Sequence, residues 1–382
     1  MGKITKISYK NLFNKNSIFF SLCILSMFFM FWYGYNSNYW NMGDRYSNTT
    51  FLSGRIIEII EDNTSINEAG ARVGQQTLLV RLLQGTRRGE IVEVNNLLFP
   101  IEHSVFGVVG QRVLVFFDNA DGHNYFSHIQ SYDRTIGIWI VIIGFLGLLA
   151  LVFGKSGIRS AFSLVFTFFC IIFWLLPIIV NGTSPIISTI FISIVIIVVS
   201  IISIMGFGKK TVAASVGSVM GILSYAISYY IISFFLNITG FNVSQIDVLV
   251  IAGFATTASE LLFASILIAS IGGIMDVAVS LASSTYEISI SNPKTNFKYL
   301  FISGMKVGRD IIGSSANTLI LAFTGAFFIQ LLLFSVTGVD VFVAINRTDI
   351  SIEILRAIAS SSAIILVAPA TVLFSAKIMC KK

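Results

Sequence analysis

The chain has 382 residues, of which 55% are hydrophobic and only 12% are charged, and its mean hydropathy is +0.84. Water-soluble domains carry about twice that share of charged residues, so the composition excludes an ordinary soluble enzyme or binding domain. The net charge of +6 indicates anionic lipid rather than nucleic acid as the partner, because every lysine lies in a terminal tail or in a short link between apolar runs.

The N-terminal region predicts a membrane anchor. Residues 1–16 form a basic tail without an acidic residue, and residues 17–35 are an apolar run long enough to cross a bilayer as a helix. No A-x-A cleavage pattern follows the run. We therefore expect an uncleaved transmembrane anchor with a cytoplasmic N-terminus, rather than a signal peptide.

Residues 36–133 change in character and predict a small extracytoplasmic β-rich domain. Apolar and polar residues alternate at 55–60, 76–83, 90–94 and 112–117, which is the period of half-buried strands. About five short strands separated by turns suit an OB-like barrel. The spacing of His123 and His128 beside Asp118 and Asp121 matches no zinc signature, so we predict a solvated turn there, with no metal site and no cofactor.

Residues 134–378 predict a bundle of seven further transmembrane helices, followed by a cytoplasmic tail at 379–382. The apolar runs lie near 135–153, 160–180, 185–206, 211–236, 260–283, 311–336 and 355–377. With the anchor they make an α-helical polytopic protein of about eight spans in the plasma membrane, with both termini in the cytoplasm. This topology places every lysine inside and residues 36–133 outside. Residues 245–258 fit an interfacial helix, a re-entrant segment or an extension of the next span.

Asp276 is the strongest candidate for a functional residue, because an ionisable group within an apolar span is costly to expose to lipid. Helical spacing places it on one face with small or polar residues, and small residues let another helix approach closely. A carboxylate in such a place can bind a cation or carry a proton. The members of this face are Ala269, Gly272, Gly273, Ser280, Ser283 and Glu287.

A second polar stripe follows in the next predicted helix. It comprises Lys306, Asp310, Ser314 and Asn317, with Arg309 and Thr318 beside them. Because consecutive spans are antiparallel, we expect the two stripes to meet in a polar seam that shields Asp276 from lipid. The alternative is that both aspartates lie near the inner ends of their spans, where water is within reach, and that Lys306, Arg309 and Glu287 snorkel or pair at the interface.

Three other patterns predict structural contacts only. Gly217 and Gly221, like Gly304 and Gly308, have the spacing of small residues that pack against a neighbouring helix. Glu353 and Arg356 are one helical turn apart and are expected to form an ion pair. Glu260 is expected to be solvated at the outer interface.

Several stretches resemble the YibE/F-like membrane protein family. They are Gly273-Ile-Met-Asp-Val-Ala-Val-Ser, Ser303-Gly-Met-Lys-Val-Gly-Arg-Asp, Asn317-Thr-Leu-Ile-Leu-Ala-Phe and Gly206-Phe-Gly-Lys-Lys-Thr. The resemblance covers about residues 50–378 and implies an anchor, an outer domain and a helix bundle. This chain has Gly313-Ser314-Ser315 where the family pattern has Gly-Thr followed by Met, a change that keeps a hydroxyl.

The chain is also distantly similar to the RND superfamily, which includes the Sec-type export helpers. In that similarity Asp276 matches an aspartate on a transmembrane helix, and Asp310 with Asn317 matches a polar pair on the following helix. The similarity implies coupling to the proton-motive force.

Two functions from different classes remain open. The first is a membrane transporter or exporter, with Asp276 as the coupling group supported by Asp310, Asn317 and Arg309. The second is a non-transporting accessory or assembly factor that binds a protein partner through its outer domain. The chain lacks the sequence motifs of intramembrane proteases, metal hydrolases and ATP-binding proteins, so we expect no enzyme. Its glycine-rich helix faces predict a homo-oligomer.

Overall fold

The computed structural model describes residues 4–37, 49–68, 70–85, 87–99, 105–118, 126–240, 249, 258–292 and 295–380. The chain divides into two compact units. We call residues 40–152 the β unit, and residues 1–39 together with 153–382 the bundle unit. Most of the undecided segment 245–258 lies outside the described residues, as do His123 and Asp121.

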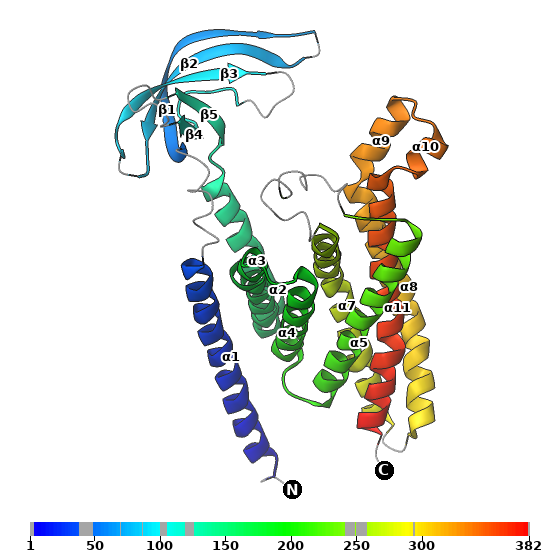
Figure 1. Cartoon of the computed structure of the whole chain (residues 1–382). Helices are drawn as coiled ribbons and strands as arrows, with labels where there is room; N and C mark the ends of the chain where they lie inside the picture. Colours follow the sequence, from blue (N-terminus) through cyan, green and yellow to red (C-terminus); the bar gives the residue numbers. More distant parts are fainter. Residues whose placement is uncertain are drawn as a thin grey trace. The chain divides into compact units, whose positions relative to one another are not determined.

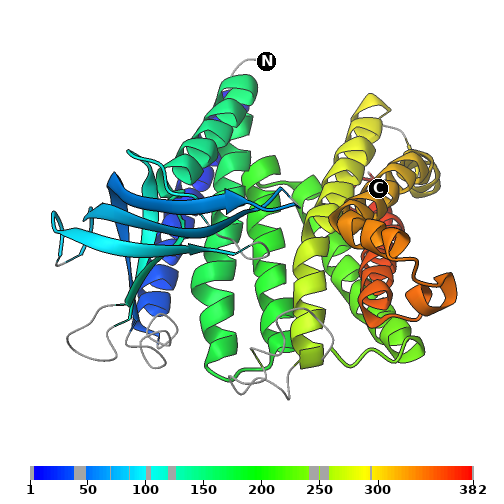
Figure 2. The ribbon, with the colours of Figure 1, turned by 90° about the horizontal axis from the view of Figure 1, so that it is seen from above.

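The β unit contains a curled sheet of five antiparallel strands (Figures 1 and 2). The strands are β1 (Thr49–Ile66), β2 (Arg72–Leu82), β3 (Ile91–Leu98), β4 (Arg112–Asp118) and β5 (Phe126–Tyr132). Their order is β3-β2-β1-β4-β5, and the long strand β1 pairs with β4 through its first residues and with β2 through the rest. The hydroxyl of Ser127 in β5 donates to the carbonyl of Glu93 in β3 at 3.1 Å, which links the two edges of the sheet. The predicted small β-rich domain is confirmed.

The interior of the curled sheet is filled by the inward-facing residues of its strands. Leu78, Val80, Val94, Val113 and Val115 are fully buried, as alternation along half-buried strands requires. The core also holds two buried polar side chains with partners. Gln76 Oε1 accepts from the backbone N–H of Gly107 at 2.9 Å, and Asn96 Nδ2 donates to the carbonyl of Val105 at 2.7 Å. These bonds fix the segment that leads into β4.

Helix α2 (Thr135–Cys170) begins in the β unit and ends in the bundle unit. Its backbone is interrupted at Gly154, where φ is 55° and ψ is −130°, a conformation that side chains other than glycine rarely adopt. The whole apolar stretch from Thr135 to Val180 has 46 residues. As one straight helix it would be about 69 Å long, more than twice the thickness of the hydrocarbon core. The break falls between the two spans predicted at 135–153 and 160–180.

The bundle unit consists of helices that lie side by side (Figure 1). A π-helical turn η2 (Ile171–Leu175) connects α2 to α3. The remaining helices are α1 (Ile4–Asn36), α3 (Leu176–Val180), α4 (Pro185–Met205), α5 (Lys209–Phe235), α7 (Ala258–Ser291), α8 (Phe297–Ala326), α9 (Phe328–Val336), α10 (Val341–Ile345) and α11 (Thr348–Met379). Among the described residues, six helices are long and apolar enough to cross a bilayer, or seven if α8 and α9, which meet at a bend of 53°, form one span. Helices of this length and composition are compatible with a multi-pass membrane protein.

Helix α8 is longer than the predicted span. The apolar run that predicts the span begins near 311, and Lys306, Arg309 and Asp310 were predicted on a polar stripe of the same helix. The helix instead begins at Phe297, where the side chain of Asn296 accepts a hydrogen bond from the backbone N–H of Tyr299 at 2.9 Å. This cap ends the link ten residues before the charged cluster. The three charged residues therefore lie inside a helix.

Candidate functional site

Helix α7, which carries Asp276, packs against four other helices: α4, α5, α8 and α11. Its buried side consists of apolar residues such as Ile266, Leu267, Ile274 and Leu281. Hydrogen bonds add to this packing. The hydroxyl of Ser270 lies 2.7 Å from that of Ser360 on α11 in the buried interior, and the hydroxyl of Tyr225 on α5 donates to the carbonyl of Phe263 at 2.8 Å. Asp276 is thus on a helix that packs against neighbours on several sides.

One narrow stripe of α7 is not covered by any described part of the chain. Between Leu261 and Ser289 every exposed residue is small or acidic: Ser265, Ala269, Gly272, Asp276 and Glu287. These residues are three, four or eleven positions apart, which places them on one face, with half-buried Ser280 and Ser283 between Asp276 and Glu287. The predicted face around Asp276 therefore exists, and it lies on the surface of the chain.

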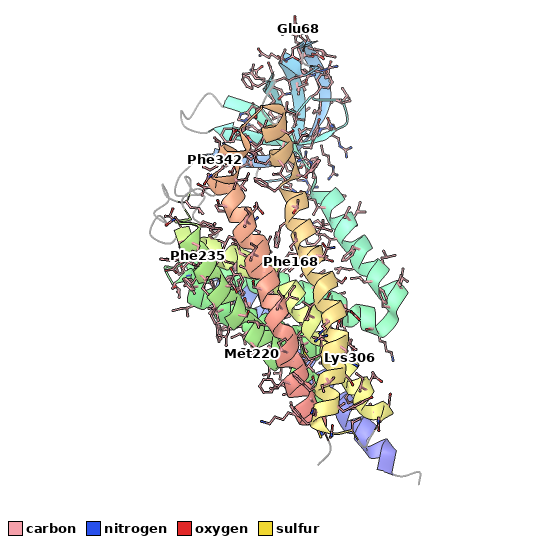
Figure 3. All side chains as sticks on the ribbon, turned by 90° about the vertical axis from the view of Figure 1, so that its right-hand side faces the viewer. Glu68, Phe168, Met220, Phe235, Lys306 and Phe342 are labelled. Carbon is pink, nitrogen blue, oxygen red and sulfur yellow. The ribbon has the colours of Figure 1, made fainter. Side chains whose placement is uncertain are left out.

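Helix α8 has a matching exposed stripe. Between Met305 and Leu319 every exposed residue is charged, polar or glycine: Lys306, Arg309, Asp310, Gly313, Ser314, Asn317 and Thr318. Figure 3 looks at the side of the bundle unit where α8 and α11 lie, with Lys306 labelled on α8. The hydroxyl of Thr318 donates to the carbonyl of Ser314 in the same helix at 2.9 Å. In the part of the chain that the structure describes, no side-chain hydrogen bond or ion pair satisfies Asp276, Lys306, Arg309, Asp310 or Asn317.

The expected polar seam between α7 and α8 is corrected by their packing. The helices touch through small residues: a Cβ on Gly304 would lie 3.0 Å from the hydroxyl of Thr285, and one on Gly308 would lie 3.4 Å from Leu281. Gly308 and Asp310 are separated by about 200° around a helix, so the side of α8 that packs is opposite its polar stripe. Docking through glycine lets the backbones approach and turns the polar stripe outward.

Both aspartates lie in the middle of their helices. At about 1.5 Å per residue, Asp276 is ~27 Å from the N-terminal and ~22 Å from the C-terminal end of α7, and Asp310 is ~20 Å and ~24 Å from the ends of α8. The contacts of Gly273 with Leu319 and of Gly308 with Leu281 set the two helices in antiparallel register. In this register Asp276 is level with the residues around Ser314, within about one helical turn of the depth of Asp310. These distances refer to helix ends, so the alternative that both aspartates lie near the inner ends of their spans stays a prediction.

Two other acidic residues of the bundle unit, Glu353 and Glu260, do have partners. Glu353 forms the predicted ion pair with Arg356 at 2.7 Å. The carboxylate of Glu260 at the start of α7 accepts a hydrogen bond from the hydroxyl of Ser184 at 2.7 Å, a contact that the sequence did not reveal. These contacts distinguish Glu353 and Glu260 from Asp276 and Asp310.

The glycine patterns assigned to packing behave as predicted. A Cβ on Gly217 would collide with the side chain of Thr371 on α11, and one on Gly221 would collide with Val367. Helix α5 therefore approaches α11 closely along this pair. Among the described residues no group of three or more histidine, cysteine, aspartate or glutamate side chains is arranged to hold a metal ion.

Comparison with known proteins identifies one family. The family model described as YibE/F-like protein matches residues 141–381, which is more than half of the chain. This match includes α7, α8 and both aspartates. No curated protein and no solved structure matches the chain.

Proposed function

We propose that this chain, which belongs to the family of YibE/F-like proteins, is a transporter or exporter whose coupling residue is Asp276. The observation that carries the proposal is the placement of Asp276 and Asp310. Two carboxylates lie mid-helix, within about one turn in depth, without a partner among the described residues. Ionisable groups at such positions mark ion pathways and proton relays in membrane proteins.

The supporting polar residues have separate roles in this mechanism. Asp276 takes up a proton or cation and releases it, and Asp310 is a second acceptor at almost the same depth. Arg309 and Lys306, exposed on α8 beside Asp310, compensate the negative charge when both carboxylates are ionised. On α8 the polar stripe continues toward the C-terminal end of the helix through Ser314, Asn317 and Thr318. On α7 the polar stripe continues toward the inner end of the helix through Ser280 and Glu287.

We further propose eight spans in the plasma membrane. Dividing the Thr135–Val180 stretch at Gly154 gives two spans, and α8 with α9 gives one. An even number places both termini on the same side. The lysines of the tails and links then face the cytoplasm, as the positive-inside rule favours, and the β unit's sheet is extracytoplasmic.

The test is a substrate-induced proton flux measured in proteoliposomes that contain a pH-sensitive dye and the full-length protein. A panel of inorganic cations, organic cations and amphiphilic anions is added under an imposed pH gradient. We expect at least one class to change the internal pH with the parent protein. Asp276→Asn, which keeps the shape of the side chain but cannot ionise, should abolish that signal.

Glu58→Gln is the control, because it neutralises an exposed acid in strand β1, outside the helices that carry the proposed mechanism. We expect this variant to retain the flux. A parent-like flux from Asp276→Asn would contradict the coupling role.

A second function is favoured by the separation of the β unit, whose sheet has its own core. As an accessory or assembly factor, the chain would bind a protein partner through this sheet and move nothing. Full-length protein purified from native membranes by a tag would then retain a stoichiometric partner, and replacement of residues 49–132 by a short linker would lose it. Such a partner, together with no flux from the whole panel, would favour this second function.

A further inference from the structure

Two exposed stripes, one on α7 and one on α8, have a composition that a lipid bilayer does not tolerate. We call them together the polar face, defined by Ser265, Ala269, Gly272, Asp276, Glu287, Lys306, Arg309, Asp310, Gly313, Ser314, Asn317 and Thr318. It contains no large apolar side chain. A charged side chain at the centre of a spanning helix costs about 2.5–3.5 kcal/mol even on the most lenient scale.

Other exposed helix surfaces of the chain have the opposite composition. The exposed residues of α1 include Leu22, Leu25, Phe28 and Phe29, and those side chains suit contact with lipid. Helix α1 therefore has an exposed surface whose apolar side chains suit contact with lipid. The polar face must instead be covered by protein or by water.

Space for a neighbouring helix is available along the polar face. A Cβ added at Gly272 or at Gly313 would meet nothing within 4 Å. Packing within one chain therefore gives no reason for glycine at either position, unlike at Gly304 and Gly308. Open glycines alone do not identify an interface, because Gly144 and Gly147 in α2 also border open space; the polar face differs in its unpaired charges.

We infer that the polar face is the interface between two copies of this chain. The central part of the face carries two acidic residues, Asp276 and Asp310, and two basic ones, Lys306 and Arg309. Parallel copies in a membrane are related by an axis along its normal, so residues of equal depth come together. Because acids and bases lie within a few turns of the same depth, the face is complementary in charge to a second copy of itself.

The glycines and the small residues Ser265 and Ala269 let the second copy approach closely, and Asn317 supplies an amide that can donate and accept across the interface. The inference goes beyond the proposed function. It requires association of two copies and no transport, so either can fail without the other.

The first test is disulfide formation in membrane vesicles that contain the full-length protein. Single cysteines are placed on the polar face by Ala269→Cys, Gly272→Cys, Gly313→Cys and Asn317→Cys. Matched controls are Leu25→Cys and Phe29→Cys on the exposed apolar side of α1, and the parent, whose Cys23 and Cys170 are buried. Under mild oxidation we expect a covalent dimer from at least two polar-face variants and none from the controls.

The second test counts subunits and does not depend on any cysteine. Fluorescently labelled parent protein is diluted in liposomes, and photobleaching steps are counted per spot. We expect two steps at high protein density and a reversible shift to one on dilution. Asn317→Leu should weaken the association about threefold to thirtyfold, which is the range for one interhelical hydrogen bond in a membrane, whereas Leu25→Ala should leave it unchanged.

A dimer that crosslinks through the polar face and is weakened by Asn317→Leu supports the inference. Single bleaching steps at all densities, or crosslinking of the α1 controls without the polar-face variants, would overturn it. In those cases the polar face is left to line a water-filled path or to meet a different protein.

Discussion

The first half of α2 and the polar face are both exposed helix surfaces, yet they are opposite in chemistry. From Thr135 to Phe153 the exposed side chains include Ile138, Trp139, Ile143 and Leu151, and no charged residue occurs. On α7 between Leu261 and Ser289, and on α8 between Met305 and Leu319, the exposed residues are small, polar or charged. Exposure in an isolated membrane chain therefore has two meanings. An apolar exposed face is a lipid contact, and a polar exposed face marks a place where something other than lipid belongs.

The largest expected effect comes from adding the same charge to each surface. Ile143→Asp places a carboxylate at the centre of the apolar helix, where we expect a loss of about 2.5–3.5 kcal/mol in membrane insertion. Ser314→Asp adds the same group at a similar distance from the ends of α8 but on the polar face, and should cost less than half as much. The measurement is the fraction of newly made protein that is integrated in membranes. Equal losses from both variants would mean that the two surfaces share one environment.

A smaller effect is expected from filling glycines that differ in their surroundings. Gly221→Leu forces a side chain against Val367 and Ile274, so the folded state should lose about 1–3 kcal/mol. Gly272→Leu meets open space in one chain and should change the stability of dilute, monomeric protein by less than about 0.5 kcal/mol. Thermal unfolding in detergent compares the two. Destabilisation by Gly272→Leu equal to that by Gly221→Leu would show that α7 packs more tightly there than the described contacts indicate.

The smallest effect concerns Asp133, at the start of the apolar half of α2. The hydroxyl of Ser53 donates to its carboxylate at 2.6 Å, and this bond holds the pKa of Asp133 below its usual value. Because the folded pKa is lowered, the ionised carboxylate stabilises the folded state. That contribution is present above about pH 4 and is lost as the pH falls through the folded pKa.

Ser53→Ala should therefore destabilise the β unit of the full-length protein at pH 7, by less than about 1 kcal/mol because the carboxylate is partly solvated. The difference between parent and variant should shrink as the pH is lowered toward 3. Urea unfolding followed by the signal of the strands provides the measurement. A difference that is independent of pH would assign the effect to lost packing of Ser53 instead.

The sequence predicted the features that depend on one local pattern. Alternation located β2, β3, β4 and the middle of β1 but not β5, and the length of the apolar runs located α4, α5, α7 and α11. Helical spacing correctly placed Asp276 with Gly272 and Ala269, and predicted the Glu353–Arg356 pair. Each of these needs only neighbours along the chain, so no knowledge of packing is required.

Features that depend on contacts between distant residues could not be predicted. The outward orientation of the α8 stripe follows from Gly304 and Gly308 docking on α7, and helical spacing cannot say which of two small or polar faces will turn inward. The start of α8 was missed because the apolar run begins only near 311, whereas the helix begins earlier, at the cap formed by Asn296. The buried Gln76 and Asn96 look like surface residues in sequence, since their partners at Gly107 and Val105 lie in another segment.

Collision rates of spin labels with oxygen, which concentrates in lipid, test most directly whether the polar face avoids the bilayer. Labels are attached to full-length protein in liposomes by Gly272→Cys, Ser314→Cys and Ile143→Cys, with native cysteines replaced by alanine. We expect a high oxygen collision rate at position 143 and rates several-fold lower at 272 and 314, whether a second copy or water covers them. Rates at 272 and 314 as high as at 143 would place Asp276 and Asp310 against lipid and contradict their functional assignment.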